Sequence, residues 1–442
     1  MSDGYNTRTL KLKIYPFGEE QKKIRDRFYQ IANDTWKAAN WISSGQYLND
    51  QLIRRVYARR KIDAKDKAQV EVIEREFFDK DGYFGSKRQA STERDIKEAF
   101  PNIPPCVSNA LNQVVVSSYN KEKSNMLMGK RSLRSYKQGM AFTTSKVSVT
   151  FFDNEDGKHG IIWRLGRDEH LSFYIYYGKD KGNYRETIQK ILDDSLDYSA
   201  PQLQVKDGAF YLLLPVKDPT KEIELNSDLS VGVDLGVSTP AYVAISKGSA
   251  KEAIGNIKDF LRVRMQLQRR IREAQRSLKL ISGGNGRTKK LKALNRFRDT
   301  ERNFTKSYNH KISRNVIDFA VKHKAGAIKM EMLEGFGDER SNGTDFILRN
   351  WSYFELQNMI EYKAKRYGIN VVKVDPYHTS QTCSACGNYE FGQRKDREFI
   401  CAKCGNKINA DQNAAVNIAR STLIVSRKED CQYFKLHQKK AA

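Results

Sequence analysis

The stretch that decides the fold is CSACGNYEFGQRKDREFICAKCGNKINAD, residues 383–411. It holds two Cys-x-x-Cys pairs, Cys383 with Cys386 and Cys401 with Cys404, separated by 14 residues. Four thiolates at this spacing are typical of a tetrahedral zinc site. The stretch ends on an acid, Asp411, at the start of a segment with helical character, for which Asn409 is a candidate N-cap. The spacing therefore predicts a structural Zn²⁺ ion, followed by a helix that carries a carboxylate in its first turn.

Two further acids stand on otherwise apolar segments upstream. Asp234 lies in VGVDLG, residues 231–236, and Glu331 lies in AIKMEML, residues 327–333. Beside Asp234, Gly232 and Gly236 are expected to leave room for a substrate backbone to approach. Burying a carboxylate in an apolar strand is costly unless it is paired or bound to a metal. Each acid alone has an ordinary interpretation: a buried salt bridge for Asp234 and Glu331, and a favourable interaction with the helix dipole for Asp411.

Taken together, the three acids favour a site for divalent metal ions. Mg²⁺ prefers oxygen ligands, and two ions about 3.5–4 Å apart can activate a water and stabilise the departing oxygen of a phosphodiester. We therefore expect Asp234, Glu331 and Asp411 to hold two Mg²⁺ ions, for which Mn²⁺ could substitute. The other nearby acids are expected to be structural or exposed; they are Asp375, Glu334, Asp338 and Glu339.

The chain is strongly basic. Its 442 residues include 78 Lys or Arg against 53 acids, a formal net charge of +25. This balance favours a polyanionic partner, nucleic acid before an anionic membrane. No apolar run reaches the length of a membrane span and the first residues lack signal-peptide features, so we expect a cytoplasmic protein without membrane contact. In a reducing compartment the paired cysteines indicate metal, and Cys106 and Cys431 are expected to carry no chemistry.

More than half of the excess charge lies between Leu261 and Arg314, a segment with 17 Lys or Arg and three acids. The sequence GGNG at 283–286 divides it into two predicted helices. Solvated surface charge is the ordinary interpretation, but this density favours contacts with phosphate groups, each of which would steepen the salt dependence of binding. The side chains predicted to bind nucleic acid are Arg262, Arg264, Arg269, Arg270, Arg272, Arg276, Lys289, Lys290, Lys292, Arg296 and Arg298.

Periodicity organises the rest of the chain. Residues 8–17 alternate as a strand does, residues 19–130 are helical, and residues 141–224 return to short strands that resemble a small β-barrel. Within them, Asp207-Gly208 between alternating runs predicts a tight hairpin. From residue 231 onwards strands and helices alternate, which indicates a mixed α/β fold. The chain lacks the motifs of serine hydrolases, zinc proteases and Walker-type phosphate loops.

The C-terminal half resembles a known family. The stretches NWSYFEL at 350–356, VDPYHTSQTCSACG at 374–387 and residues 401–419 are similar to the RuvC-like nuclease half of transposon-encoded TnpB proteins. They also resemble the descendants of TnpB, the miniature type V CRISPR effectors of subtype F. The likeness covers roughly residues 226–425, with weaker support from Tyr15-Pro16 and from MGKRSLRSYK at 128–137.

The resemblance implies a multidomain α/β protein. An N-terminal wedge β-barrel (residues 1–18 and 141–225) would carry an inserted helical recognition domain (19–140). An RNase H-like, or RuvC, nuclease domain (226–381 and 407–442, with the tail) would carry a zinc-ribbon insert that binds target nucleic acid (382–406). Asp234, Glu331 and Asp411 would match the family's catalytic triad, and the four cysteines its zinc ligands. Arg394 would match an arginine near the scissile strand and support catalysis.

The resemblance also implies an activity, that of a prokaryotic RNA-guided DNA endonuclease of a CRISPR type V system. Such a protein binds a guide RNA, reads a short motif beside the target, and cuts double-stranded and single-stranded DNA in one RuvC-like site. Many subtype F effectors act as a homodimer on one guide RNA, so two copies are one expectation and a monomer the other.

Three alternatives stay open. A transposon-encoded TnpB nuclease would share the chemistry, and the extended helical region favours the CRISPR effector over it. An RNA-guided protein that binds DNA without cutting is disfavoured by the intact triad. A structure-selective resolvase without RNA is disfavoured by the large basic N-terminal half.

Overall fold

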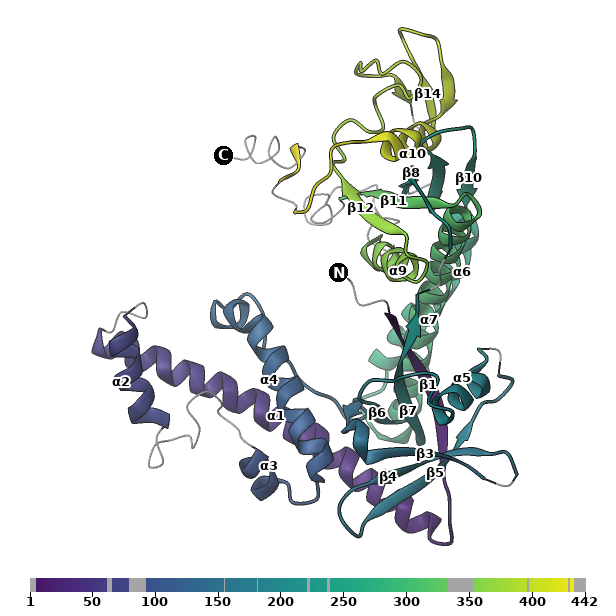
Figure 1. Ribbon diagram of the computed structural model, residues 1–442. Coiled ribbons are helices and arrows are strands. Elements are labelled where there is room, and N and C mark those ends of the chain that lie inside the picture. The colour runs from purple at the N-terminus through teal and green to yellow at the C-terminus, as the bar shows by residue number, and fades with distance from the viewer. Residues whose placement is uncertain are drawn as a thin grey trace. The chain divides into compact units, whose positions relative to one another are not determined.

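The computed structural model describes residues 5–61, 66–78, 93–154, 156–180, 182–220, 223–236, 239–332, 353–395, 397–427 and 430–432. The chain divides into two compact units: Thr7–Asp218 is the first, and Met1–Asn6 with Pro219–Ala442 is the second. Each combines helices with a sheet, so the predicted mixed α/β class is confirmed (Figure 1). Residues 350–352 of the NWSYFEL motif and the acids Glu334, Asp338 and Glu339 lie outside the described residues.

One seven-stranded sheet forms the base of the first unit. Strand β1 pairs antiparallel with β5, so the first strand of the chain joins this sheet from a distance, as the sequence predicted. No pairing of β2 with β3 closes the sheet among the described residues, and the wedge barrel stays a prediction. In sheet order the strands are β2 (Phe142–Thr143), β6 (Gln202–Lys206), β7 (Ala209–Pro219), β1 (Tyr5–Pro16), β5 (His170–Tyr176), β4 (His159–Arg164) and β3 (Val149–Asp153).

The predicted hairpin at Asp207-Gly208 is confirmed. Lys206 of β6 pairs with Ala209 of β7, which leaves a two-residue loop. Asp207 has φ 52° and Gly208 has φ 74°, and two positive φ values are what a tight turn matched to the strand twist requires.

A long helix packs its aromatic side chain into this sheet. Phe28 of α1 is fully buried, and its ring stacks on Phe210 at a centroid distance of 4.5 Å. Phe173 and Trp163 meet the same ring edge-on at 5.5 and 5.7 Å. The helices of this unit are α1 (Gln21–Arg60), α2 (Lys67–Phe78), α3 (Glu93–Ala99), α4 (Pro105–Leu127) and α5 (Tyr184–Leu192), with a short 3₁₀ turn at Lys146–Ser148.

The second unit is built on a five-stranded sheet in the order β10-β9-β8-β11-β12. The central strands β8 and β11 are parallel, as are β11 and β12, whereas β9 and β10 run antiparallel to their neighbours. The strands are β8 (Asn226–Asp234), β9 (Ala241–Ile245), β10 (Lys251–Ile254), β11 (Ala325–Glu331) and β12 (Asn370–Val374).

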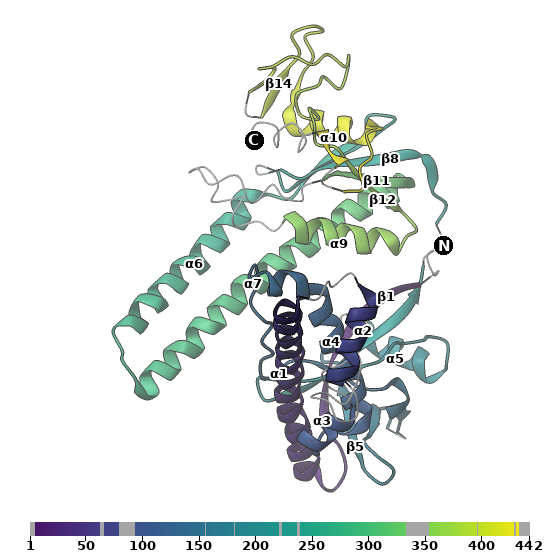
Figure 2. The same cartoon turned by 90° about the vertical axis from the view of Figure 1, so that its left-hand side faces the viewer.

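Alternation along the two central strands decides which helices cover each face. Val231 and Val233 of β8 and Met330 of β11 are buried in a core shared with helices α7 (Gly284–Lys322) and α9 (Tyr353–Lys365). The residues between them face helix α10 (Ala410–Arg420), which lies on the other side of the sheet (Figures 1 and 2). The catalytic candidates Asp234 and Glu331 belong to this second set.

Helix α10 lies directly on β8 at a glycine. A Cβ atom placed on Gly232 would stand 2.1 Å from the carbonyl oxygen of Ala415 and 2.3 Å from the amide nitrogen of Ala419. The Ser230 hydroxyl donates a hydrogen bond of 2.7 Å to the carbonyl of Ala419. Our sequence reasoning left the space at Gly232 for a substrate; the structure corrects this, because the backbone of α10 occupies it.

Two further parts complete the second unit. Helices α6 (Ile257–Lys279) and α7 form the basic hairpin (Figure 2). Helix α6 ends at Lys279 and α7 begins at Gly284, inside the predicted GGNG break. A three-stranded sheet of β13 (Arg394–Lys395), β14 (Glu398–Ile400) and β15 (Lys407–Asn409) lies in the cysteine region. Within the described residues, no helix combines the length and the apolar character needed to cross a membrane.

Replacing Gly232 by Ala should destabilise the second unit, because the new methyl group must push α10 away from β8. Overpacking of this kind costs about 1–3 kcal/mol. Gly286→Ala is the matched control, since nothing lies within 4 Å of a Cβ atom there. Differential scanning fluorimetry should show a lower melting temperature for Gly232→Ala alone. Equal melting temperatures for both variants would contradict the packing described here.

Candidate active site

The three predicted carboxylates are carried by three neighbouring elements. Asp234 ends β8 and Glu331 ends β11, and the parallel register that pairs Val233 with Met330 brings these two ends side by side. Asp411 lies in the first turn of α10. The side chain of Asn409 caps this helix by accepting hydrogen bonds from the amides of Asp411 and Gln412 at 2.9 and 3.1 Å. The predicted N-cap is thus confirmed, and it fixes the backbone that carries Asp411.

Burial and neighbouring charges shift the pKa values of two of the carboxylates, Asp234 and Glu331. Burial raises the pKa of Asp234 well above its usual value, and the charges of Glu331 and Asp411 raise it further. Burial also raises the pKa of Glu331, against the opposing effects of the Thr379 hydroxyl and of Arg394. Carboxylates in such a site are stabilised as anions when cations stand beside them.

Asp411 supplies the observation that tests whether a metal ion fits. It is 5% exposed, and its Oδ2 atom has no hydrogen-bond partner among the described residues. Buried polar atoms are almost always satisfied, so an orphaned carboxylate oxygen calls for a ligand. A hard divalent cation matches this all-oxygen donor set. The three acids do not converge as tightly as the four cysteines. Among the described residues, the cysteines form the one group of possible metal ligands whose ligand atoms all lie within 4.8 Å of one another.

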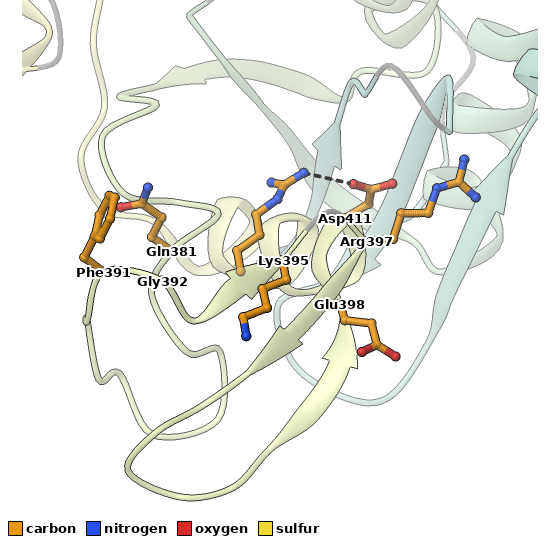
Figure 3. Close-up of a pocket in the computed structure, with 8 residues that line it drawn as sticks. Gln381, Phe391, Gly392, Lys395, Arg397, Glu398 and Asp411 are labelled. Carbon is orange, nitrogen blue, oxygen red and sulfur yellow. Dashed lines mark ion pairs between the residues drawn. The ribbon is translucent and has the colours of Figure 1, made fainter.

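Arg394 reaches the triad from the cysteine region. It lies on β13, and its Nη2 atom stands 3.6 Å from Oδ1 of Asp411. Both residues line a cavity of about 1100 Å³, open to solvent (Figure 3). The rest of its lining is Gln381, Phe391, Gly392, Lys395, Arg397 and Glu398. Arg394 therefore brings a positive charge from the cysteine region to the catalytic candidates.

The four cysteines converge as their spacing predicted. Sγ of Cys383 lies 3.7 Å from Sγ of Cys404, and Sγ of Cys386 lies 3.6 Å from Sγ of Cys401. Ligands about 2.3 Å from a tetrahedral zinc ion stand about 3.8 Å apart, so the thiols fit this metal. The amide of Cys404 donates to Sγ of Cys401 at 3.5 Å, and such backbone donors lower the pKa of Cys401 to about 6.

Two asparagines connect the cysteine unit to the helix of Asp411. Nδ2 of Asn413 donates to the carbonyl of Thr382 at 2.7 Å, and its Oδ1 accepts from the amide of Ser384 at 2.9 Å. Nδ2 of Asn417 donates to the carbonyls of Thr379 and Thr382 at 2.8 and 2.7 Å. Helix α10 thereby holds the segment that enters the cysteine unit.

Sequence reasoning missed these asparagines, and also Thr379 and Tyr242. The Thr379 hydroxyl donates to the carboxylate of Glu331. Tyr242 lies directly opposite Asp234 on β9, and its pKa is raised by burial and by the charge of Asp411. The spacing of Asn409, Asn413 and Asn417, four residues apart in an alanine-rich helix, was a signal that could have shown a polar face.

The basic hairpin separates into exposed and structural side chains. Arg264 faces α7, where its Nε donates to Glu301 at 3.0 Å with both side chains largely buried, so it braces the hairpin. Lys290 is half-buried and reaches the carbonyl of Ser277. Nine predicted phosphate contacts are exposed: Arg262, Arg269, Arg270, Arg272, Arg276, Lys289, Lys292, Arg296 and Arg298.

Asp375 is structural, as expected. Its Oδ1 atom accepts from the amide of Tyr377 at 3.0 Å, and its Oδ2 atom accepts from the amide of Gln432 at 2.6 Å. The carboxylate is 3% exposed.

Comparison with known proteins decides the family. Residues 353–418 match the model "Cas12f1-like, TNB domain", and residues 213–334 match the model "Probable transposase". The CRISPR-associated endodeoxyribonuclease Cas12f1 of Sulfoacidibacillus thermotolerans is 36% identical over 321 residues, which cover 68% of this chain and 72% of that protein. The chain belongs to the Cas12f1-like family.

Other family members agree with this assignment. The Cas12f1 of Syntrophomonas palmitatica is 33% identical over 267 residues, which cover 52% of each protein. A solved Cas12f1, in a complex with sgRNA and target DNA, has the same fold with a TM-score of 0.69 at 20% identity, covering 96% of this chain and 100% of the solved one.

Replacing Asp234 by Asn should raise the melting temperature of the metal-free protein at neutral pH, because the amide keeps the shape without the charge. The raised pKa sets the sign. The folded protein holds a proton that the unfolded chain releases near the usual pKa of 3.8, so stability falls as pH rises from there through the raised value. In chelator, the wild type should therefore lose more stability than the variant as pH rises above the usual value of 3.8.

Added Mg²⁺ should reverse this order at about pH 8, because it stabilises the protein that keeps all three carboxylates. Thermal melts of both proteins in chelator and in Mg²⁺ make the measurement. Identical pH slopes, or equal stabilisation of both by Mg²⁺, would show that Asp234 is not a ligand.

Replacing Cys383 by Ser should remove the bound zinc, because it deletes one of four ligands. Structural zinc sites contribute about 10–16 kcal/mol in isolated finger peptides, so the insert should unfold locally. Cys106→Ser in the first unit is the matched control, since Cys106 lies outside the cysteine cluster. Elemental analysis should find zinc in the control alone; equal zinc in both variants would refute the assignment.

Proposed function

We propose that this protein is an RNA-guided DNA endonuclease of a CRISPR type V system, which hydrolyses phosphodiester bonds in a single RuvC-like site. The observation that carries the proposal is the meeting of Asp234, Glu331 and Asp411, with one buried carboxylate oxygen left without a partner. The endodeoxyribonuclease activity in the printed names of the family's members supports it. The mixed sheet with α10 across its central strands is compatible with an RNase H-like domain.

Asp234, Glu331 and Asp411 would hold two Mg²⁺ ions, or Mn²⁺ in their place. The ions would supply an activated water and charge neutralisation at the departing oxygen. The residues of the chain orient this site: the Thr379 hydroxyl holds the Glu331 carboxylate, and the Asn409 cap holds the backbone of Asp411. Arg394 stands close enough to Asp411 to donate to a phosphate oxygen of the bound strand, which would stabilise developing charge.

The remaining parts would select and hold the nucleic acids. We infer that residues 1–18 and 141–225 form the wedge domain and residues 19–140 the recognition domain, which hold the guide RNA and read the motif beside the target. The complex of a solved Cas12f1 with sgRNA and target DNA supports these partners. Pairing with the guide would choose the sequence, while the protein recognises shape and backbone.

The remaining nuclease segments, 226–381 and 407–442, would flank a zinc-ribbon insert at 382–406 that binds the target strand. The exposed arginines and lysines of the α6–α7 hairpin would neutralise phosphates. Arg264 and Lys290 are left out of this surface because they face the hairpin itself.

One observation favours a second function. Residues 213–334 match the "Probable transposase" model, which fits a TnpB nuclease guided by a transposon-end RNA. Sequencing the RNA that co-purifies with the protein separates the two, because a CRISPR guide carries a repeat-derived handle and a variable spacer. Analytical ultracentrifugation gives the mass of the same complex, which shows whether one or two protein copies share the RNA.

Alanine at Asp234, Glu331 or Asp411 should abolish cutting of a guide-matched target, while binding of guide RNA and target DNA persists. The reason is that each carboxylate would hold a metal ion, whereas exposed arginines and lysines would supply most of the affinity for guide RNA and target DNA. Glu252→Gln on β10 is the control, an exposed acid that should leave cutting unchanged. Gel-based cleavage and filter-binding assays measure the two properties. Cutting that survives any one alanine would remove that residue from the site.

A further inference from the structure

An exposed phenyl ring stands at the mouth of the candidate active site. Phe391 is 86% exposed, yet it lines the same cavity as Asp411 and Arg394. Figure 3 draws Phe391 and Gln381 at one end of this group and Asp411 and Arg397 at the other. Isolated apolar side chains on a surface are common and need no function. Its place in the same cavity as a candidate catalytic carboxylate and several cations sets this one apart.

The loop that carries Phe391 is held on both sides. The ring of Tyr389 packs on the ring of His378 at a centroid distance of 3.9 Å. Gln393 is 6% exposed, its Nε2 atom donates to the carbonyl of Glu390 at 3.2 Å, and its Oε1 atom accepts from the amide of Ala402 at 3.0 Å. Gly392 turns the chain between them with φ 92°, a conformation that favours glycine. The exposed ring is therefore presented by a fixed backbone, which lowers the entropy cost of binding a ligand.

The backbone that carries two cations of the cavity is held in place as well. Lys395 lies on β13 next to Arg394. The carbonyl of Arg397 accepts a hydrogen bond of 2.8 Å from the amide of Ala410, which ties Arg397 to the start of the helix of Asp411. An aromatic face next to positively charged side chains is the arrangement by which proteins hold single-stranded nucleic acid, since every base has a face that can stack.

We propose that Phe391 is a base-stacking residue of a subsite for single-stranded DNA, which holds the nucleotide next to the scissile phosphate. Lys395 and Arg397 bind the flanking phosphates of the same strand. Stacking on Phe391 fixes the position of the strand along the cavity, so that one phosphate stands at Asp234, Glu331 and Asp411. The inference rests on the proposed nuclease function and adds a positioning residue to it.

The variants of the test separate ring stacking from apolar bulk. Phe391→Trp keeps an aromatic face, Phe391→Leu keeps apolar volume without one, and Phe391→Ala removes both. Val147→Ala is the control, an 84% exposed apolar residue in the first unit. Every protein is purified with its guide RNA, and unchanged zinc content and melting temperature confirm its fold.

The probe is a short single-stranded deoxyoligonucleotide that contains 2-aminopurine, bound in Ca²⁺ to prevent cutting. Wild type, Phe391→Trp and Val147→Ala should quench its fluorescence; Phe391→Leu and Phe391→Ala should not. Loss of one stacked base should weaken binding on the order of ten- to a hundredfold. An oligonucleotide with an abasic site in place of the stacked base should bind wild type and Phe391→Ala equally. Quenching and affinity that do not change in Phe391→Ala would overturn the proposal.

Cleavage of a guide-matched target in Mg²⁺ distinguishes the two levels of the account. If wild type cuts and all Phe391 variants bind and cut as it does, the subsite is wrong and the nuclease assignment stands. If wild type cuts no DNA with its guide, the proposed function itself fails. Phe391→Ala should still cut, with a raised KM for the single strand and with cut positions spread over neighbouring phosphates. A single unchanged cut position in this variant would also overturn the positioning role.

Discussion

The close approach of helix α10 to strand β8 at Gly232 is the contact on which the site depends. Only a residue without a side chain lets the helix backbone reach the sheet at this point. The approach brings the first turn of α10, with Asp411, against the ends of two parallel strands that carry Asp234 and Glu331. Successive residues of a strand face opposite sides of the sheet. Val231 and Val233 therefore lie in the core on one face of β8, and Gly232 and Asp234 lie on the face that meets α10.

Without metal ions, this arrangement is electrostatically unfavourable when the carboxylates are ionised. Three carboxylates share a partly buried site, the pKa values of Asp234 and Glu331 are raised, and one oxygen of Asp411 lacks a partner in the described structure. Arg394, which belongs to the cysteine unit, offsets part of the repulsion among the carboxylates. The same asparagines that satisfy the carbonyls of Thr379 and Thr382 tie that unit to α10, so the thiol cluster and the carboxylates are one connected structure.

Much of the chemistry could be predicted from local patterns. The cysteine spacing, the Asp207-Gly208 turn, the Asn409 cap and the break between α6 and α7 are short-range features, and the structure confirms each of them. The three acids were recognisable because a carboxylate is out of place on an apolar strand. Their placement at neighbouring ends of elements follows the strand pairing.

What sequence reasoning missed depends on contacts between distant segments. The space at Gly232 was predicted to admit a substrate, because nothing in VGVDLG reveals that residues almost 190 positions later pack on this glycine. Arg264 was predicted to bind phosphate like its neighbours in sequence, but in the structure it pairs with Glu301 of the facing helix α7. Thr379 and Asn417 gained their roles only through partners on other elements. The role of Phe391 likewise arises from the cavity around it, since its own neighbours in sequence suggest only a polar loop.

The central claim is that these three carboxylates form a divalent metal site distinct from the thiol cluster. Diffraction at the manganese and zinc absorption edges, from crystals of the guide-bound protein grown with Mn²⁺, tests it most directly. The account predicts manganese peaks among Asp234, Glu331 and Asp411 and a zinc peak among the four cysteines. Carboxylates that contact only Arg394, with manganese absent or bound elsewhere, would contradict it.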